Sequence, residues 1–162
     1  MSIYIFLRPI GSGKTTELQK WCGQQKNISG ILMPDIDGCR RFFDITAKHI
    51  FDAECIDPVK TKEPLTSIGR FYFYTAAFEK ANSILSGALS QNPGWLVIDE
   101  AGKLELKGEG LHSSVAAAVK WYSNKNKPGN LLISVRDSLY EEVISFFNIK
   151  NFKLIDRLDA IM

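Results

Sequence analysis

The feature that most constrains the fold is a short apolar run that leads directly into a glycine-containing loop. Residues 3–7 are apolar and rich in strand formers, so they predict a strand buried on both faces. The loop follows at once, and residues 14–25 predict a helix. In α/β proteins built from such units, ligands bind beyond the carboxyl ends of the parallel strands. The sequence therefore predicts a ligand site on this loop.

The residue types in the loop suit a polyphosphate. Gly11 and Gly13 allow the backbone to wrap closely and to aim N–H groups at phosphate oxygens, and the start of the helix adds more N–H groups. Lys14 can reach the β- and γ-phosphates, Thr15 can ligate Mg²⁺ and Thr16 can contact the α-phosphate. We predict a site for a nucleoside triphosphate such as ATP or GTP, formed by Arg8, Pro9, Ile10, Gly11, Ser12, Gly13, Lys14, Thr15 and Thr16.

Arg8 departs from the usual pattern of such loops, G-x-x-x-x-G-K-[ST], in which the first position is glycine. If that position needs a positive φ, the arginine is strained by about 1–2 kcal/mol. If φ is negative, arginine fits freely. Its guanidinium could then add affinity for phosphate or crowd the entrance to the site. The sequence leaves these alternatives open.

Strand and helix patterns alternate along the rest of the chain. Further strands are predicted at residues 28–33, 95–98 and 131–135, at Phe71–Tyr74 and at Phe152–Ile155. Helices are predicted at residues 75–89, along an apolar face within residues 111–122, and at residues 138–147 with Asp137 as N-cap.

Two segments break this alternation. Residues 41–46 and 48–51 follow the turn signal Asp37-Gly38 and predict a small antiparallel addition. Residues 56–69 contain two prolines and little periodicity, so they predict a loop. Together the patterns predict a three-layer α/β fold with a mostly parallel central sheet, helices on both faces and a small antiparallel hairpin addition. We expect residues 1–162 to form a single domain.

A second motif follows the predicted strand at residues 95–98. Asp99 comes directly after this apolar run, where its carboxylate can hold Mg²⁺ together with Thr15. Glu100 is placed to activate the water that attacks the γ-phosphate. An acidic pair alone is a weak motif, and its pairing with the phosphate-binding loop makes the functional interpretation the stronger one.

The composition limits the partners and the compartment. A formal net charge of +2 gives no basic surface of the kind that nucleic-acid binders carry, so we expect none as a partner. Three cysteines without a Cys-x-x-Cys pair argue against a disulfide framework or a zinc site and suit a cytoplasmic location. The opening apolar run ends at Arg8, too early for a membrane span. The oligomeric state stays open, with a monomer as one option.

Residues 97–106, V-I-D-E-A-G-K-L-E-L, resemble the V-I-D-E-I-G-x-M-E-L signature of the THEP1-type nucleoside-triphosphatases. Residues 29–44 and 68–79 also resemble segments of that family, and the resemblance extends from the loop to about residue 145. It implies a P-loop NTPase fold and slow, Mg²⁺-dependent hydrolysis of nucleoside triphosphates to diphosphate and phosphate, with loose base preference. Residues 8–15 and 96–103 would then contact nucleotide or metal.

The chain departs from the family at four places. Ala101 replaces the usual isoleucine, Leu104 replaces methionine and Arg8 replaces the loop glycine; phenylalanine also stands in segment 39–44, where the family tends to have glycine. The first two changes are apolar swaps. Only Arg8 is of a kind that could alter activity.

A positive group facing the γ-phosphate would speed the reaction. Candidates are Arg40, Arg70, Lys103, Arg136 and Arg157. Arg136 is the preferred one, because it directly follows the predicted strand at residues 131–135. Two other classes of function stay open. A small-molecule or nucleotide kinase would need an acceptor pocket and an arginine-rich lid, and a nucleotide-switched binding module would need neither.

Overall fold

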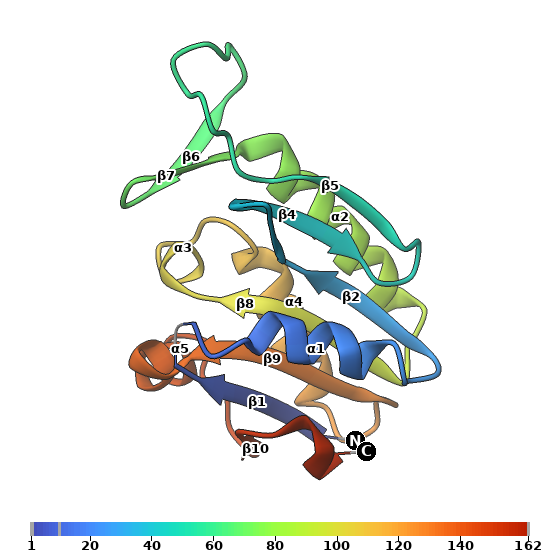
Figure 1. Cartoon of the computed structure of the whole chain (residues 1–162). Helices are drawn as coiled ribbons and strands as arrows, with labels where there is room; N and C mark the ends of the chain where they lie inside the picture. The colour runs from blue at the N-terminus through green and yellow to red at the C-terminus, as the bar shows by residue number, and fades with distance from the viewer. Residues whose placement is uncertain (1, 10, 162) are drawn as a thin grey trace.

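Eight strands form the central sheet of the computed structural model, which describes residues 2–9 and 11–161 (Figure 1). They are β1 (Ser2–Arg8), β2 (Ile28–Leu32), β3 (Asp35–Ile36), β4 (Cys39–Asp44), β5 (His49–Asp52), β8 (Trp95–Ala101), β9 (Asn130–Arg136) and β10 (Phe152–Ile155). The order across the sheet is β10-β1-β9-β8-β2-β4-β3, and β5 pairs with β4. Strands β10, β1, β9, β8 and β2 are parallel, and β4 joins β2 antiparallel.

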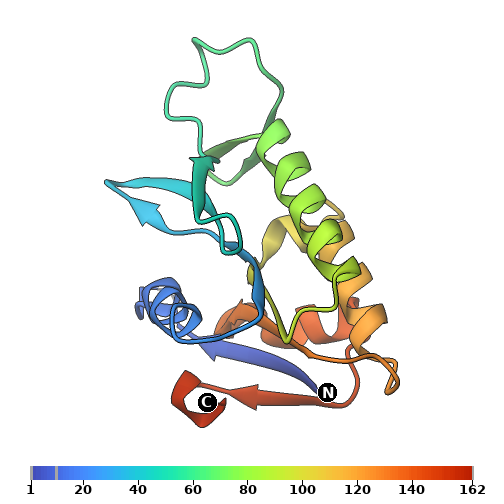
Figure 2. The same cartoon turned by 90° about the vertical axis from the view of Figure 1, so that its right-hand side faces the viewer.

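Helices cover the sheet on both faces, as Figure 2 shows edge-on. They are α1 (Lys14–Cys22), α2 (Thr75–Ser90), α3 (Lys103–Leu106), α4 (His112–Tyr122) and α5 (Tyr140–Phe146), with 3₁₀ turns η1 (Asp137–Leu139) and η2 (Leu158–Ile161). α1 and η2 lie on one face, and α2, α4 and α5 lie on the other (Figure 2). No helix among the described residues is long and apolar enough to cross a membrane.

Side chains of the central strands point alternately to the two faces of the sheet and form the two halves of the core. On β9, Leu131 and Ile133 pack with α2 and α4, while Leu132 between them packs with Leu18 and Trp21 of α1. All three strand residues are fully buried. Because successive side chains of a strand point to opposite faces, a continuous apolar run is what a sheet covered on both sides requires.

Two tight hairpins flank the carboxyl edge of the sheet. Asp37 and Gly38 connect β3 to β4 with φ angles of 54° and 78°, and positive φ at both positions matches the type I′ turn. A separate two-stranded sheet pairs β6 (Leu65–Ile68) with β7 (Phe71–Tyr74). Gly69 opens their turn with φ 57°, and this hairpin projects beyond the central sheet at the top of Figure 1.

The α/β fold, the parallel sheet and the antiparallel addition are confirmed. Three local predictions are wrong. Residues 56–69 are not all loop, since Leu65–Ile68 pairs with β7. Asp137 does not cap a helix: it is the first residue of η1, and no side-chain cap hydrogen bond forms there. The first helix ends at Cys22 instead of residue 25, and the left-handed Asn27, with φ 54°, turns the chain into β2.

Candidate functional site

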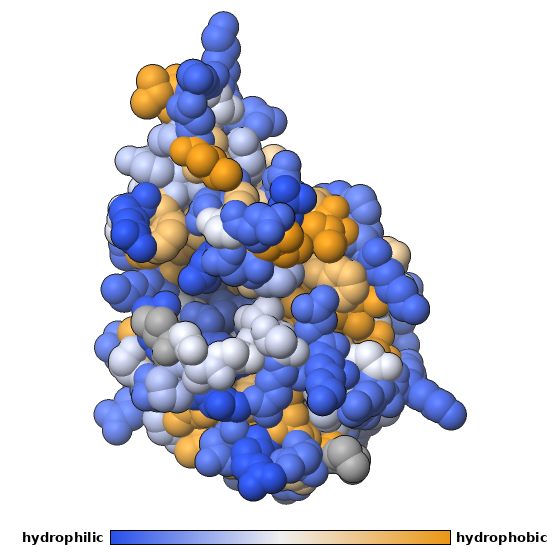
Figure 3. All heavy atoms as spheres, in the orientation of Figure 1, coloured by the Kyte–Doolittle hydropathy of each residue, from blue (hydrophilic) through white to orange (hydrophobic). Residues whose placement is uncertain are grey.

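The predicted loop lies at the carboxyl end of β1, next to the ends of β9 and β8. Gly11 and Gly13 have φ angles of 70° and 79°, which side chains rarely adopt, and Gly13 is the N-cap of α1. A cavity of about 340 Å³ opens above the start of this helix, and Figure 3 shows a hollow bordered by hydrophilic side chains on this face. Its lining includes Pro9, Gly11, Gly13, Lys14, Thr15 and Thr16.

Two other predicted residues of the loop are not found in the lining of this cavity. Ile10 lies outside the described residues. Ser12 is not part of the cavity lining, and its carbonyl accepts a hydrogen bond from the Arg8 guanidinium at 3.3 Å. Most, but not all, of the residues 8–16 that were predicted to bind phosphate thus line this cavity.

Asp99 lies at the centre of a hydrogen-bond network beneath the cavity. Its carboxylate is 1% exposed and accepts bonds from Thr15 Oγ1 at 3.0 Å, from the Met33 N–H at 3.1 Å and from Ser134 Oγ at 2.6 Å. Burial raises the pKa of Asp99 above its ordinary value, while the hydrogen bonds from Ser134 and Met33 oppose that rise. The network fixes the carboxylate beside the Thr15 hydroxyl, as the sequence predicted.

The donor set beside the loop fits Mg²⁺. The Thr15 hydroxyl, which lines the cavity, and the Asp99 carboxylate, which lies beneath it, are hard oxygen donors 3.0 Å apart. Among the described residues, no group of three His, Cys, Asp or Glu side chains could hold a metal by itself. A pair of protein oxygens with the remaining positions left to water and phosphate is the arrangement that Mg²⁺ prefers.

Glu100 lines the phosphate-loop cavity and its neighbour Asp99 lies buried beneath that cavity, although neighbouring strand residues normally point to opposite faces of the sheet. The pairing of β8 with β9 shifts register between Asp99 and Ala101, so Glu100 is bulged out of the ladder. Lys14 Nζ donates to its carboxylate at 2.6 Å, and Arg136 Nη2 lies 3.9 Å from its other oxygen. The bulge therefore brings the second carboxylate and two cations to one point.

Arg136 is the last residue of β9, so it lies at the carboxyl end of that strand. It lines the cavity, and its Nε is buried without a hydrogen-bond partner among the described residues. Arg40, from β4, also lines the cavity, whereas Arg157 pairs with Asp159 on the surface near the C-terminus. Arg70 and Lys103 line a neighbouring cavity instead. Of the expected contacts at residues 96–103, Leu96, Val97 and Ile98 are fully buried core residues and cannot reach a nucleotide.

Arg8 resolves the question raised by the missing glycine. It continues strand β1, and its φ is not among the positive values found in the described residues. Its guanidinium forms an ion pair with Glu17 of α1, and Glu17 in turn accepts the Leu158 N–H at 3.3 Å. Arg8 does not line the cavity. It therefore joins the loop to α1 and η2, and it neither strains the backbone nor crowds the entrance.

Arg8→Gly is expected to lower the free energy of unfolding by about 1 kcal/mol, because it removes the ion pair and frees the backbone of the unfolded chain. Nucleotide affinity is expected to stay near that of the parent. Urea unfolding and a nucleotide titration measure the two quantities. Glu17→Gln is the matched control, since it breaks the same pair from the helix. A large fall in affinity in Arg8→Gly alone would mean that the guanidinium contacts phosphate.

Sequence reasoning missed two contributors to the site, Ser134 and the Met33 N–H. Ser134 is a fully buried polar residue in an apolar strand, and that contrast was the available signal. The Met33 N–H lies just before the β3–β4 hairpin, and no local pattern marks it. Arg40, from the same region, was one of the five candidate cations, but the sequence did not favour it over the others.

The chain resembles known proteins in its fold and matches the sequence model of one family. No curated protein matches the chain. Two solved structures are similar: THEP1 from the hyperthermophile Aquifex aeolicus, with a TM-score of 0.71 and 19% identity over 99% of this chain and 92% of that one; and a human cancer-related nucleoside triphosphatase, with a TM-score of 0.60 and 20% identity over 95% and 88%. The model of the NTPase family matches residues 4–155, nearly the whole chain, and the chain belongs to the NTPase family.

Proposed function

We propose that this chain hydrolyses nucleoside triphosphates to nucleoside diphosphate and phosphate in a Mg²⁺-dependent reaction. The observation that carries the proposal is the position of Glu100, whose carboxylate lies between Lys14 and Arg136 at the rim of the phosphate-loop cavity. Membership of the NTPase family and the likeness to a nucleoside triphosphatase support it.

Phosphoryl transfer depends on positioning and charge neutralisation, and each residue of the site has a separate role in it. The loop amides and Lys14 hold the β- and γ-phosphates, and Thr15 and Asp99 would hold the metal. When bound, Mg²⁺ neutralises charge on the phosphate oxygens. Glu100 takes a proton from water as the water oxygen bonds to the γ-phosphorus and the bond from that phosphorus to the bridging oxygen breaks. Arg136 faces the charge that develops on the γ-phosphoryl group.

The lining of the cavity supports a loose base preference. Among the described residues that line it, none is aromatic, so the structure offers no stacking platform for a base there. Affinity then comes from the phosphates, which are common to all nucleoside triphosphates. Slow turnover is expected as well, because Arg136 is held near Glu100 and its charge is shared between that carboxylate and the substrate.

The test is phosphate release from ATP, GTP, CTP and UTP, measured with Mg²⁺ and with EDTA. We expect slow release from all four nucleotides with Mg²⁺, at rates that differ little among them, and loss of release with EDTA. A folded protein that binds the nucleotides tightly and releases no phosphate would contradict hydrolysis and favour a nucleotide-switched binding module.

A further inference from the structure

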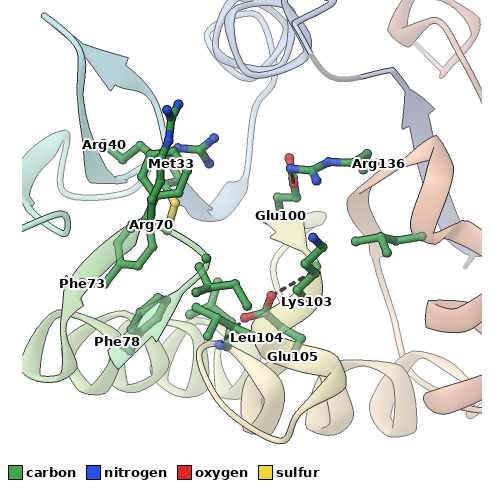
Figure 4. A pocket seen from close by; sticks show the side chains of 16 residues that line it. Met33, Arg40, Arg70, Phe73, Phe78, Glu100, Lys103, Leu104, Glu105 and Arg136 are labelled. Carbon is green, nitrogen blue, oxygen red and sulfur yellow. Dashed lines mark hydrogen bonds and ion pairs between the residues drawn. The ribbon is translucent and has the colours of Figure 1, made fainter. Parts of the chain in front are cut away.

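A second cavity, of about 330 Å³, adjoins the phosphate-loop cavity (Figure 4). The two share Met33, Arg40, Glu100 and Arg136 in their linings. Glu100 therefore lies where the two cavities meet. A molecule bound in the second cavity would have one end next to the carboxylate that we propose acts on the γ-phosphate.

The walls of the second cavity are largely apolar and aromatic. Phe71 and Phe73 come from β7, Phe78 from α2 and Leu104 from α3. The ring centroids of Phe73 and Phe78 are 5.7 Å apart in an edge-to-face arrangement, so they form a rigid wall. A volume near 330 Å³ falls within the range of small-molecule sites, about 300–1,000 Å³. The shape and chemistry suit the flat body of a small aromatic molecule.

The charges around this cavity favour an anion. Arg40 and Arg70 both lie over the Phe71 ring, with their guanidinium carbons 5.7 and 5.1 Å from its centroid. Neither of them, nor Lys103, forms an ion pair with a carboxylate in the described part of the chain. The buried Glu105 carboxylate accepts the Gly102 and Leu111 N–H groups at 2.8 Å, so it is already occupied.

The cavity is polarised along its length. In Figure 4, Arg40 and Arg70 lie on the left with Phe73 and Phe78 below them, Glu100 and Arg136 lie across from them on the right, and Leu104 lies between the two sides at the bottom. An occupant that satisfies both ends would place an anionic group at the two arginines and a proton-bearing group near Glu100. A hydroxyl group meets the second requirement, because a carboxylate accepts its proton and repels an anion.

We propose that this cavity is an acceptor site for a small aromatic molecule that carries an anionic group and a hydroxyl, and that the chain transfers the γ-phosphoryl group to that hydroxyl. The hydroxyl oxygen bonds to the γ-phosphorus, its proton moves to Glu100, and the bond to the bridging oxygen breaks to release nucleoside diphosphate. The transfer rests on the proposed function, since it uses the same loop and the same carboxylate. Binding of a molecule in the cavity does not depend on the proposed function.

The experiment first measures binding by calorimetry with Mg²⁺ and saturating β,γ-imido-ATP, which occupies the phosphate loop without reacting. The ligands are the four ribonucleoside 5′-monophosphates and 4-(hydroxymethyl)benzoate. Benzyl alcohol, without the anion, and 4-methylbenzoate, without the hydroxyl, are the matched controls. Transfer is then followed with γ-³²P-labelled ATP as label moving from ATP to the ligand instead of to free phosphate.

Two variants change the cavity and leave the phosphate loop intact. Arg70→Gln removes an exposed guanidinium, and Ile68→Trp fills space from the half-buried end of β6. We expect each to weaken binding of the anionic ligand about tenfold or more, because a charge-assisted contact or the space itself is lost. Phosphate release to water should stay near the parent rate. Arg41→Gln is the control, since Arg41 does not line this cavity and pairs with Asp52.

Binding of at least one hydroxyl-bearing ligand, its loss in Arg70→Gln and Ile68→Trp, and label in that ligand would support the acceptor site. Absence of binding by every ligand, displacement by β,γ-imido-ATP, binding unchanged in both variants, or binding without any transfer of label would overturn it. A parent protein that transfers label to the ligand and releases no phosphate to water would refute the proposed hydrolysis alone and leave this site standing.

Discussion

Glu100→Gln is expected to slow phosphate release by about 10²–10⁴-fold, the range by which a positioned general base accelerates a reaction. The amide keeps the size of the side chain and can still accept the hydrogen bond from Lys14, which is 2.6 Å away in the parent. It cannot take a proton from water. Nucleotide affinity should be retained or should increase, because the substitution removes a negative charge beside the γ-phosphate. Steady-state phosphate release and a Mg²⁺-nucleotide titration measure the two effects separately.

Opposite changes in turnover and affinity are what distinguish a base from a structural residue at this position. Glu109→Gln is the matched control, because Glu109 is exposed and lies outside both cavities. Glu100→Asp keeps the carboxylate but withdraws it from the site, so it should fall between the parent and Glu100→Gln. A parent rate in Glu100→Gln, or a parallel loss of turnover and affinity, would remove Glu100 from the role of base.

The parallel sheet could be predicted because each central strand is buried on both faces and reads as an apolar run. Residues 131–135 and 95–98 need no tertiary information to be recognised as such strands. β6 was missed for the opposite reason. Leu65–Ile68 is half-buried or exposed, follows a proline and pairs only with β7. Gly69-Arg70, between β6 and β7, is a two-residue hairpin signal, but the proline-containing segment before it made that signal hard to recognise.

Residues of the candidate site could be predicted where a single sequence motif marks a single loop or strand. Lys14, Thr15 and Asp99 were identified because a loop and a strand end each have a recognisable composition, and parallel strands bring their carboxyl ends to the same edge. In the β3–β4 region, the Met33 N–H could not be found in this way, and Arg40 could be named only as one of five candidate cations. Arg40 reaches both cavities from an antiparallel hairpin whose path depends on the packing of β4 against β2. The second cavity depends on this hairpin and on β6–β7 together.

Lys14→Ala is expected to weaken nucleotide binding about tenfold or more and to lower phosphate release by about 10²–10³-fold, because it removes a charge-assisted contact to the transferred group. Lys14 is 8% exposed at the first position of α1, so its ammonium group is held within the site instead of extending into solvent. Calorimetry measures the affinity. As a second readout, Mg²⁺-nucleotide should raise the melting temperature of the parent but not that of the variant. Lys20→Ala, on the exposed side of the same helix, is the control.

The same substitution also tests how substrate binding and the base are linked. In this structure the ammonium group of Lys14 is bonded to Glu100, so a triphosphate that takes Lys14 as a partner must break that contact and free the carboxylate for water. Arg136, at 3.9 Å, would then be the remaining cation beside Glu100. Lys14→Ala removes this exchange altogether. If nucleotide affinity and phosphate release in Lys14→Ala equal those of Lys20→Ala, then Lys14 serves only to hold Glu100 in place, and the phosphates are bound by the loop amides and the metal alone.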